Sequence, residues 1–480
     1  MSLNSSSGGA HLPDEIRPIN IGLQEFAEAV RIQGAEVVRV DWRVPAGGRR
    51  ELIAALGRAY GPRGAAISEA NREVVRRLDQ SSAFWTGVLS AGECIPNMGE
   101  RTILHPGPPL SPEELCDPLR RSVRAAITAE GWSSSPEEAD RLLENGEVEL
   151  RPANHHNTVL PMASALGPSS PAIVVENPDG QTKAYTGINQ GPGKRAWFGV
   201  DQPEAVQNLL LLRDVISPLL DKIVREGEPL DVFAVISQAL LMGDDAHMRS
   251  QAATNLAIRF LLPQLADLND PRTRELADFL SGNHLFFLNL SMAGAKAAAT
   301  WAAQVEGSTV VSTMARNGTT FGIQVAGENG RWFIAEAPPV EDALYRGDFS
   351  SDEAARDIGD SAILELVGLG GAAAAASPSL AAFRGGSMAD AATSSEDALQ
   401  ICVDRSSRFK LPYLDFGGSP IGVDVRQAVE LQTTPSINTG ILSRSGGHGQ
   451  IGAGVARAPL ECFEKALLAL DEASPISGDK

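Results

Sequence analysis

The sequence predicts a multidomain protein of mixed α/β and α+β architecture. The chain has 480 residues, and domains commonly span roughly 100 to 200 residues, so three or four domains are expected. Near the N-terminus, strand-like and helix-like runs alternate, whereas residues 203–305 carry almost continuous helical spacing. After residue 306 the pattern changes to short β-rich runs separated by glycine-rich loops.

Residues 15–98 are expected to form a Rossmann-like α/β domain behind a disordered tail over residues 1–14. The prediction rests on a β-α-β unit of three consecutive runs: the strand-like PINIGL (18–23), the helix-like QEFAEAVRIQG (24–34) and the strand-like AEVVRVDW (35–42). A second helix is expected across residues 68–80. The turn after the first strand reads GLQEF and lacks the glycines that cradle a pyrophosphate, which argues against a dinucleotide there.

The middle of the chain predicts an α+β domain followed by a helical subdomain. In residues 99–202 the proline-rich HPGPPLSPEE opens a helical stretch, and the runs PAIVVEN (171–177) and KAYTGI (183–188) are typical of strands. Residues 203–305 carry helical spacing in successive apolar runs, which indicates a mostly helical subdomain.

The last part of the chain, residues 306–480, predicts a second α+β domain with glycine-rich loops. Two β-rich runs are joined at Asn317-Gly318, the commonest signal for a two-residue β-hairpin. A further β-like run, RWFIAEA, follows soon after and extends the hairpin into a meander.

The charge balance excludes several classes of partner. The chain has 41 basic and 60 acidic residues, a net charge of −19 at pH 7, so its field repels nucleic acid and anionic lipid surfaces. We therefore expect no nucleic-acid partner and no membrane association. A small anionic ligand needs a local cluster of Arg, Lys or backbone N–H groups strong enough to overcome that field.

Cysteine usage and hydropathy indicate a cytoplasmic protein. The four cysteines lie far apart without a C-x-x-C pair and are expected to be reduced thiols: Cys94, Cys116, Cys402 and Cys462. The sequence has no stretch of about 18 uncharged apolar residues and no signal-peptide pattern. No short-spaced set of metal ligands is evident, and we expect neither a metal nor a cofactor.

The segment LMGDDAHMRSQ lies between two helical runs and carries the first candidate site. One interpretation is that Gly243 ends one helix and Asp244 or Asp245 caps the next. The alternative is catalytic: Asp244 orients His247, three residues later on the same face, for proton transfer, and Arg249 serves as an anion clamp. Metal binding by the first two is less favoured, since no third ligand is close in sequence.

Two further segments present groups suited to anions. Arg316 in TMARNG is expected at the tip of the hairpin, either as a solvated turn residue or as a bidentate clamp for a carboxylate or phosphate. The stretch DIGDSAILELVGLGG combines carboxylates with glycines ahead of an Ala-rich helix: Asp357, Asp360, Glu365, Gly368, Gly370 and Gly371. These glycines either offer N–H groups to an anion or permit close packing.

GGHGQIGAG near the C-terminus contains the spacing Gly447-x-Gly449-x-x-Gly452, which is typical of dinucleotide-binding loops. It lies outside any predicted β-α-β unit, and too little chain follows it for a second half of such a fold. We interpret it as a loop whose N–H groups face an anion, or as a close packing of backbone segments. The loop NQGPGKRAWFG, with Lys194, is not a Walker motif but is suited to an anion.

Several stretches, in order along the chain, together resemble one family. They are TILHPGPP, NQGPGK with the following FG, MGDDAH-x-R, TMARNG, DIGDSAILE with GLGG, SINTG, and IGAG followed by CFEKA. Over about residues 18–470 the chain is similar to the YahG/YlbE-like family, long listed as a domain of unknown function. One member, encoded with allantoin-degradation enzymes, is a subunit of oxamate carbamoyltransferase beside an acyl-CoA-synthetase-like protein. The resemblance implies carbamoyl or acyl transfer to a small carboxylate.

The shared motifs mark the candidate site. They contain Lys194, Asp244, His247, Arg249, Arg316, Asn317, Asp360, Glu365 and Asn438. Carbamoyl transfer needs cations on phosphate and carboxylate, donors on the polarised carbonyl oxygen and a base for the amine proton, and these residue types supply them. We expect His247, oriented by Asp244, to transfer the proton. The groups expected to hold the anions and the oxyanion are the side chains of Lys194 and Arg316 and the glycine-loop N–H groups, including those of Gly370, Gly371, Gly449 and Gly452.

Three histidines fall outside this pattern. His155 and His156 are adjacent, so their side chains face apart, and we expect a surface loop rather than a shared metal. The segment that holds them is altered from the family pattern, and His448 stands where the family is commonly apolar. We therefore do not assume that this chain has the same substrate as the characterised member.

Three hypotheses of different classes follow. The favoured one is a group-transfer enzyme or enzyme subunit of carbamoyltransferase type, acting on an oxamate- or oxalurate-like carboxylate. Its rival is a non-catalytic ligand-binding subunit that supports an acyl-CoA-synthetase-like partner, and a homodimer is left open. A third, an oxidoreductase built on the N-terminal unit, is disfavoured by the missing glycine loop. If there is one site, the segments 242–249, 313–318, 357–371 and 436–454 should converge on one cleft.

Overall fold

The computed structural model describes residues 18–21, 23–40, 44–328, 330–383 and 386–472. The tail expected over residues 1–14 lies outside this range. Within the described residues the strands form several separate sheets, which alternate with helices along the chain and confirm the mixed α/β class. No described helix is long and apolar enough to cross a membrane.

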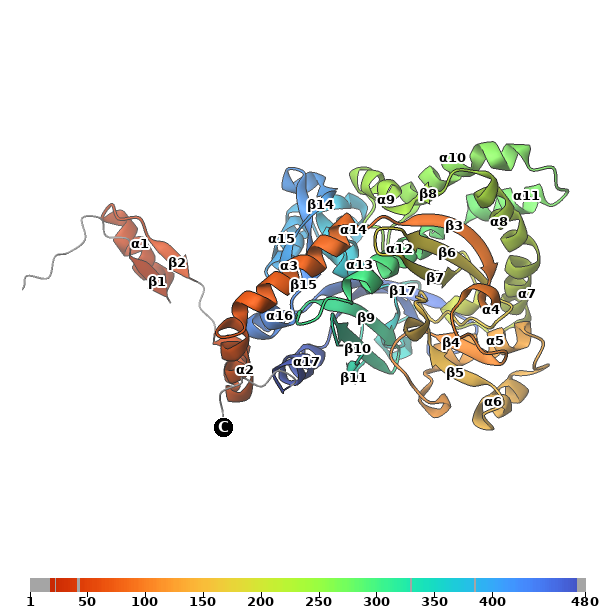
Figure 1. Ribbon diagram of the computed structural model, residues 1–480, viewed down its shortest axis with the longest axis horizontal. Coiled ribbons are helices and arrows are strands. Elements are labelled where there is room, and N and C mark those ends of the chain that lie inside the picture. Colours follow the sequence, from red (N-terminus) through yellow and green to blue (C-terminus); the bar gives the residue numbers. More distant parts are fainter. Residues whose placement is uncertain (1–17, 22, 41–43, 329, 384–385, 473–480) are drawn as a thin grey trace, which may run out of the picture.

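The N-terminal β-α-β unit forms as the apolar pattern predicts. It consists of β1 (Ile19–Ile21), α1 (Gln24–Ile32) and β2 (Val38–Val40). The two strands pair in parallel, and the unit stands apart from the rest of the chain in Figure 1. Its sheet ends at these two strands.

The structure does not confirm the Rossmann-like layer expected over residues 15–98. The later elements of that range, α3 (Gly64–Gln80) and β3 (Phe84–Ser90), do not join the sheet of β1 and β2. Instead β3 pairs in antiparallel fashion with a strand near residue 174. Apolar periodicity locates a strand, but its partner is set by packing between distant segments, which a local pattern does not contain.

One four-stranded sheet, of order β7-β6-β3-β8, lies beside the central helix of the body. Its remaining strands are β7 (Thr182–Gly187), β6 (Pro171–Asn177) and β8 (Leu230–Asp231). Helix α12 (Phe286–Ala302) packs against β6 and β7, and α8 (Ser217–Glu226) packs against β3. The buried ring of Trp85 on β3 lies 6.0 Å from that of Phe286 on α12, which ties this helix to the sheet.

The predicted hairpin is the centre of a second four-stranded sheet, of order β11-β10-β9-β13. Its strands are β11 (Phe333–Glu336), β10 (Thr320–Val325), β9 (Val311–Asn317) and β13 (Ile358–Gly359). Gly318 has a φ of +82°, which the turn requires and which glycine adopts without steric cost. The meander of β9, β10 and β11 is thus confirmed.

The other sheets of the body are smaller. They comprise the three-stranded β12 (Glu341–Tyr345), β17 (Gln450–Arg457) and β16 (Ser436–Leu442), the pair β14 (Cys402–Leu411) and β15 (Gly417–Val423), and the parallel pair β4 (Thr102–His105) and β5 (Glu149–Pro152). Strand β17 pairs with β12 and β16 along its two edges, so the C-terminal glycine-rich segment is held inside a sheet.

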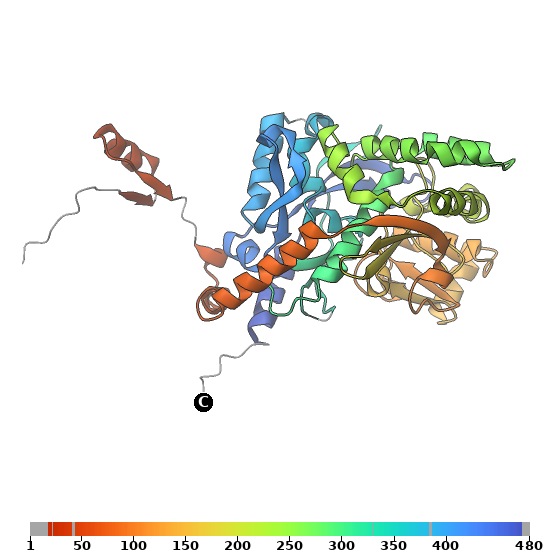
Figure 2. The same ribbon diagram turned by 45° about the horizontal axis from the view of Figure 1, so that its top comes forward.

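Residues 203–305 are mostly helical, as predicted, with the short β8 between helices. Their further helices are α7 (Pro203–Leu211), α9 (Val232–Leu241), α10 (Gln251–Asp267) and α11 (Thr273–Gly282). Figures 1 and 2 show α7, α8, α10 and α11 gathered on the side of the body away from the β1-α1-β2 unit. Helix α12 differs, because it runs through the middle of the body and is buried along nearly its whole length.

The remaining helices surround the sheets. They are α2 (Arg50–Tyr60), α4 (Ala91–Cys94), α5 (Asp117–Ala129), α6 (Pro136–Glu144), α13 (Ile363–Leu366), α14 (Pro378–Phe383), α15 (Met388–Leu399), α16 (Val425–Leu431) and α17 (Leu460–Glu472), with short 3-10 segments that include η3 (Ala153–His156) and η7 (Gly370–Ala376). Buried residues from all four predicted domains join one hydrophobic cluster, among them Leu52, Val123, Leu220 and Phe321. The domain boundaries themselves stay predictions.

Candidate functional site

The candidate site is built around a hydrogen-bonded pair, His247 and Glu365, from segments 118 residues apart. His247 lies in the loop between α9 and α10, and Glu365 lies on α13. Nδ1 of the imidazole is 2.7 Å from Oε1 of the carboxylate, and the side chains are only 4% and 2% exposed. Because a carboxylate accepts hydrogen bonds, we assign the imidazole proton to Nδ1, which leaves Nε2 as the basic atom.

Asp245 fixes the loop that carries His247. Its carboxylate accepts from the backbone N–H groups of His247 (3.1 Å) and Arg249 (2.7 Å) and from Nδ2 of Asn438 (2.8 Å). Its backbone carbonyl accepts from the N–H of Gly370 at 2.8 Å. Asp245 is fully buried, so these bonds satisfy a carboxylate that would otherwise be costly in the interior. It therefore joins the His247 loop, β16 and the glycine segment before η7.

The glycines before and at the start of η7 permit close packing against the His247–Glu365 pair. The N–H groups of Gly370 and Gly371 are already hydrogen-bonded. Gly370 has a φ of +60°, and a Cβ there would overlap Oε1 of Glu365 and crowd Nδ1 of His247. The N–H of Gly371 donates to Oε1 of Glu365 at 3.2 Å, and that of Gly370 is taken by Asp245. Of the two alternatives for these glycines, the structure favours packing. The oxyanion contact expected from them would require one of these bonds to break.

His247 lines a narrow cleft, about 470 Å³ when the open solvent at its mouth is included, which we call the His247 cleft. Its walls are mostly apolar, with Trp197, Phe198 and Leu288 among them. The polar side chains of the lining are those of His247, Ser361, Asn438, Thr439 and Gln450. Three of the four segments expected to converge, 242–249, 357–371 and 436–454, therefore meet at this cleft, as predicted. Oδ1 of Asn438 is buried without a partner among the described residues.

The fourth segment contributes no residue to the lining of the cleft, but Arg316 contacts two residues that line it. This residue is on β9, one position before the turn residue Asn317, and is fully buried. Its guanidinium donates to both carboxylate oxygens of Asp357, at 2.7 and 3.0 Å, and to the carbonyl of Gly359 at 2.7 Å. Weaker contacts reach the hydroxyls of two residues that line the cleft, Ser361 at 3.4 Å and Thr439 at 3.3 Å.

The expected place of Arg316, at an exposed hairpin tip, is wrong. Strand β13 pairs with β9 opposite Arg316 and brings Asp357 to it, so the side chain is enclosed by its own ion pair. A guanidinium has five N–H donors, and this one is engaged by carboxylate, carbonyl and hydroxyl oxygens. An anion clamp at Arg316 would therefore need a buried ion pair to break.

Asp244 caps helix α10. Glu365, and not Asp244 as expected, is the carboxylate that bonds to His247. Oδ2 of Asp244 accepts from the N–H of Ala253 in the first turn of α10, at 2.9 Å. Arg249 Nε lies 3.4 Å from its other oxygen. Burial raises the pKa of Asp244 to about 6. A sequence spacing of three residues suggested contact with His247, but the loop is not helical at this point, so the two side chains need not share a face.

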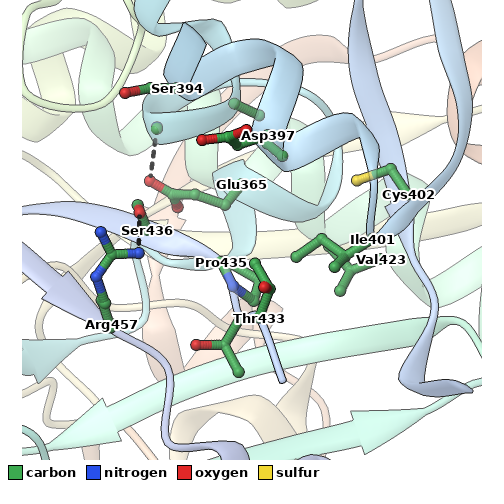
Figure 3. A pocket seen from close by; sticks show the side chains of 14 residues that line it. Glu365, Ser394, Asp397, Ile401, Cys402, Val423, Thr433, Pro435, Ser436 and Arg457 are labelled. Carbon is green, nitrogen blue, oxygen red and sulfur yellow. Dashed lines mark hydrogen bonds between the residues drawn. The ribbon is translucent and has the colours of Figure 1, made fainter. Parts of the chain in front are cut away.

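Glu365 also lines a second hollow, about 600 Å³ when the open solvent at its mouth is included, which we call the Glu365 hollow (Figure 3). Ser394, Asp397 and Ser436 contribute polar groups to it, and the Arg457 guanidinium donates to the Ser436 hydroxyl at 3.2 Å. Oε2 of Glu365 is buried without a partner among the described residues. The pair thus joins two hollows, with the imidazole at one and the carboxylate at the other. The sequence analysis did not single out Arg457, which belongs to no recognisable spacing, and it considered Asp245 only as a helix cap.

The remaining candidates lie outside the pair. Oδ1 of Asn317 accepts from the N–H groups of two residues of the hairpin turn, so it shapes that turn. Asp360 accepts from the N–H groups of Gly107 and Leu160, both at 2.8 Å, and burial raises its pKa to about 7. Lys194 is exposed on the loop that contributes Trp197 and Phe198 to the His247 cleft.

The three histidines outside the shared motifs occupy different environments. His155 is exposed and accepts the indole N–H of Trp332 at 2.9 Å. His156 is buried, with Nδ1 2.8 Å from the carbonyl oxygen of Pro96, so the surface loop expected for it is wrong. His448 is exposed, with its ring edge-on to Phe349. Among the described residues no group of three or more His, Cys, Asp or Glu side chains converges as metal ligands do.

The glycine spacing near the C-terminus runs into β17 rather than into a helix. Gly449 lies just before the strand with a φ of +71°, and Gly452 lies in β17 where the backbone of β12 approaches it closely. In the described part of the chain this segment leads into a strand and not into a helix N-terminus, so the geometry that holds a pyrophosphate is missing. We expect calorimetric titration with NAD, NADP and FAD to show no heat of binding. Micromolar affinity for any of them would contradict this interpretation.

Comparison with known proteins supports one family. The family model described as oxamate carbamoyltransferase subunit AllG matches residues 148–361. The protein of Escherichia coli K12 named oxamate carbamoyltransferase subunit AllG is 39% identical over 415 residues, which cover 85% of this chain and 99% of that protein. The chain belongs to the YahG/AllG-like family. The uncharacterized protein YahG of the same strain is 34% identical over 453 residues, 94% of this chain and 96% of YahG.

The YahG/AllG-like fold is also found among solved structures. A conserved protein of unknown function from Enterococcus faecalis V583 has a TM-score of 0.82 and 35% identity, over 84% of this chain and 97% of its own. The family resemblance stated from the motifs is thus confirmed. His247, Arg316 and Asp360 fall inside the residues that the AllG family model matches, whereas Glu365 and Asn438 lie beyond them.

Proposed function

We propose that this member of the YahG/AllG-like family is a subunit of a carbamoyltransferase that acts on a small carboxylate of the oxamate type. The observation that carries the proposal is the buried His247–Glu365 pair at the wall of the His247 cleft. Support comes from the relative AllG, whose name describes a subunit of oxamate carbamoyltransferase. The imidazole is the proton acceptor, and Glu365 is its positioning residue.

The proposed step is a carbamoyl transfer from carbamoyl phosphate to oxamate. The amide nitrogen of oxamate attacks the carbamoyl carbon, a C–N bond forms, and the bond from that carbon to the phosphate oxygen breaks. The nitrogen loses a proton to Nε2 of His247, and phosphate leaves with the electron pair of the broken bond. Glu365 stabilises the imidazolium that results, as a buried carboxylate beside a histidine does in other acyl-transfer sites. Asn438, with Oδ1 free, is placed to accept an N–H of the substrate.

The lining of the His247 cleft favours a subunit over a self-sufficient enzyme. None of its described lining residues is Lys or Arg, although phosphate and carboxylate both need a cation in a chain of net charge −19. Lys194, exposed on the bordering loop, is our candidate for one cation from this chain. We propose that a partner of the acyl-CoA-synthetase-like kind supplies the rest when it covers the cleft.

Reconstitution tests this function. The chain and its acyl-CoA-synthetase-like partner are purified separately and together, and oxalurate formation from oxamate and carbamoyl phosphate is followed by mass spectrometry. We expect oxalurate from the mixture and only the uncatalysed rate from either protein alone. A mixture no faster than the uncatalysed reaction would refute the transferase proposal. Full activity of a mixture whose His247 is replaced would instead favour the non-catalytic, ligand-binding subunit.

A further inference from the structure

A lysine that the proposed reaction does not use lies inside the body. Lys296 sits on α12 within the apolar run AGAKAAAT, and it is 5% exposed. Its Nζ donates a hydrogen bond to Oδ1 of Asn154 on η3 at 3.2 Å, and this is the one hydrogen bond that Nζ makes among the described residues. An ammonium group has three N–H donors, so two of them have no acceptor there. A buried cation with unused donors is costly unless an acceptor is bound beside it.

Lys296 lines a hollow of about 1100 Å³, counted to its open mouth, which we call the Lys296 cavity. A single water occupies about 30 Å³ of liquid, so the space holds a ligand of several heavy atoms. Thr300, one helical turn after Lys296 and on the same face of α12, also lines it. Ser312 and Thr313 of β9 are also lining residues.

Two further polar groups of the cavity have no partner among the described residues. They are Nδ2 of Asn154, which carries two N–H donors, and the hydroxyl Oγ1 of Thr300, and both atoms are buried. Beside them lies Nζ of Lys296, which has its bond to Asn154 and two further N–H donors, so three neighbouring groups have unused donors. Most buried polar groups in proteins are hydrogen-bonded, so a cluster of three unmet donors indicates an acceptor ligand.

The charges of the residues that line the cavity indicate the charge of that ligand. Among the described lining residues Lys296 is the cationic side chain, since burial lowers the pKa of His155 below its ordinary value, and none is Asp or Glu. Burial lowers the pKa of Lys296 to about 8, and Asp360 opposes this shift, so the ammonium form prevails at pH 7. The carboxylate oxygens of Asp360 are already bonded to backbone N–H groups of Gly107 and Leu160. A ligand with negative oxygens therefore fits better than a cation or a neutral donor.

We propose that the Lys296 cavity binds a small anion, a carboxylate or a phosphate, through Nζ of Lys296, Nδ2 of Asn154 and the hydroxyl of Thr300. The site is separate from the His247 cleft, since the two share no lining residue. It does not rest on the transferase proposal, and its test has no activity readout.

The test is calorimetric titration of the full chain at pH 7 with inorganic phosphate and, separately, with oxamate. We expect one of the two anions to bind the wild type, and its identity separates a phosphate ligand from a carboxylate. Lys296→Met should weaken that binding by at least about tenfold, because it removes a charge-assisted hydrogen bond. Thr300→Val, which removes one neutral hydroxyl, should weaken it about threefold to tenfold. The matched control is Lys183→Met at an exposed lysine of β7, which should bind as the wild type does.

A second measurement needs only the wild type and covers the case in which Lys296→Met does not fold. Acetic anhydride modifies lysines at pH 8 according to their neutral fraction and access, and mass spectrometry reports the rate at each site. The bound anion should slow acetylation of Lys296 at least about tenfold and leave Lys183 unchanged. The proposal is overturned if neither anion binds, if the Met variant binds as tightly as the wild type, or if neither anion protects Lys296.

Discussion

The His247→Gln variant is expected to form oxalurate about 10²- to 10⁴-fold more slowly than the wild type in the reconstituted mixture, the usual contribution of a general base. Glutamine resembles the imidazole in length, with its amide near the position of Nε2 rather than of Nδ1, and it keeps a polar side chain at this place, so the fold should survive. It has no group that accepts a proton at neutral pH. The rate loss should therefore appear in kcat, while binding of the chain to its partner is unchanged. The measurement is initial-rate kinetics with mass-spectrometric detection of oxalurate.

His448→Gln is the matched control, because that imidazole is exposed and bears no hydrogen bond to a carboxylate among the described residues. It should retain the wild-type rate. Glu365→Gln should lose rate as well, since an amide can donate to Nδ1 and so favour the wrong tautomer of His247. Equal rates for the wild type and His247→Gln would remove the imidazole from the mechanism.

The Arg316→Met variant is expected to lose about 3 to 5 kcal/mol of unfolding free energy, because removal of one partner leaves the Asp357 carboxylate buried and unpaired. Both side chains are fully buried, so water does not replace the lost bonds. Since β9 and β13 are held together at this pair, the loss should affect the whole sheet of the hairpin. Urea unfolding followed by circular dichroism measures the shift in midpoint.

Two comparisons separate this ion pair from charge removal in general. Arg274→Met removes an exposed arginine that pairs with Asp278 on the surface, and its midpoint should match that of the wild type. Combining Arg316→Met with Asp357→Leu should recover part of the lost stability, because no unpaired charge remains. If Arg316→Met unfolds at the wild-type midpoint, the pair does not stabilise the fold.

Local structure was predictable where neighbouring residues decide it. The hairpin at Asn317-Gly318 follows from a turn that needs a positive φ, and the strand at 171–177 was predicted with the bounds that β6 has. The β1-α1-β2 unit and the helices of residues 203–305 follow from apolar spacing. Each of these patterns involves residues that contact one another within a few positions.

The candidate site was predictable only in part. Motif order brought His247, Glu365 and Asn438 into one candidate list, and the structure places the first two in contact and the third beside them. The pairing was assigned wrongly, since Asp244 was expected to orient His247. Arg316 was expected near the hairpin tip, either as a solvated turn residue or as an anion clamp, although β13 encloses it. Lys296 was passed over, because a lysine in an alanine-rich helix has no local signature of burial.

The sequence by itself determined the helices, the hairpin, the family and the segments that form the His247 cleft, because propensity, turn chemistry and motif order are written in consecutive residues. Only the tertiary structure decided which strand β3 joins, that Glu365 rather than Asp244 bonds His247, and that Lys296 faces a cavity. Each of these contacts joins residues far apart in the chain, 118 positions for His247 and Glu365 and 142 for Lys296 and Asn154. Such contacts form when burial of apolar surface across the whole body offsets the entropy of closing long loops, so no local stretch encodes them.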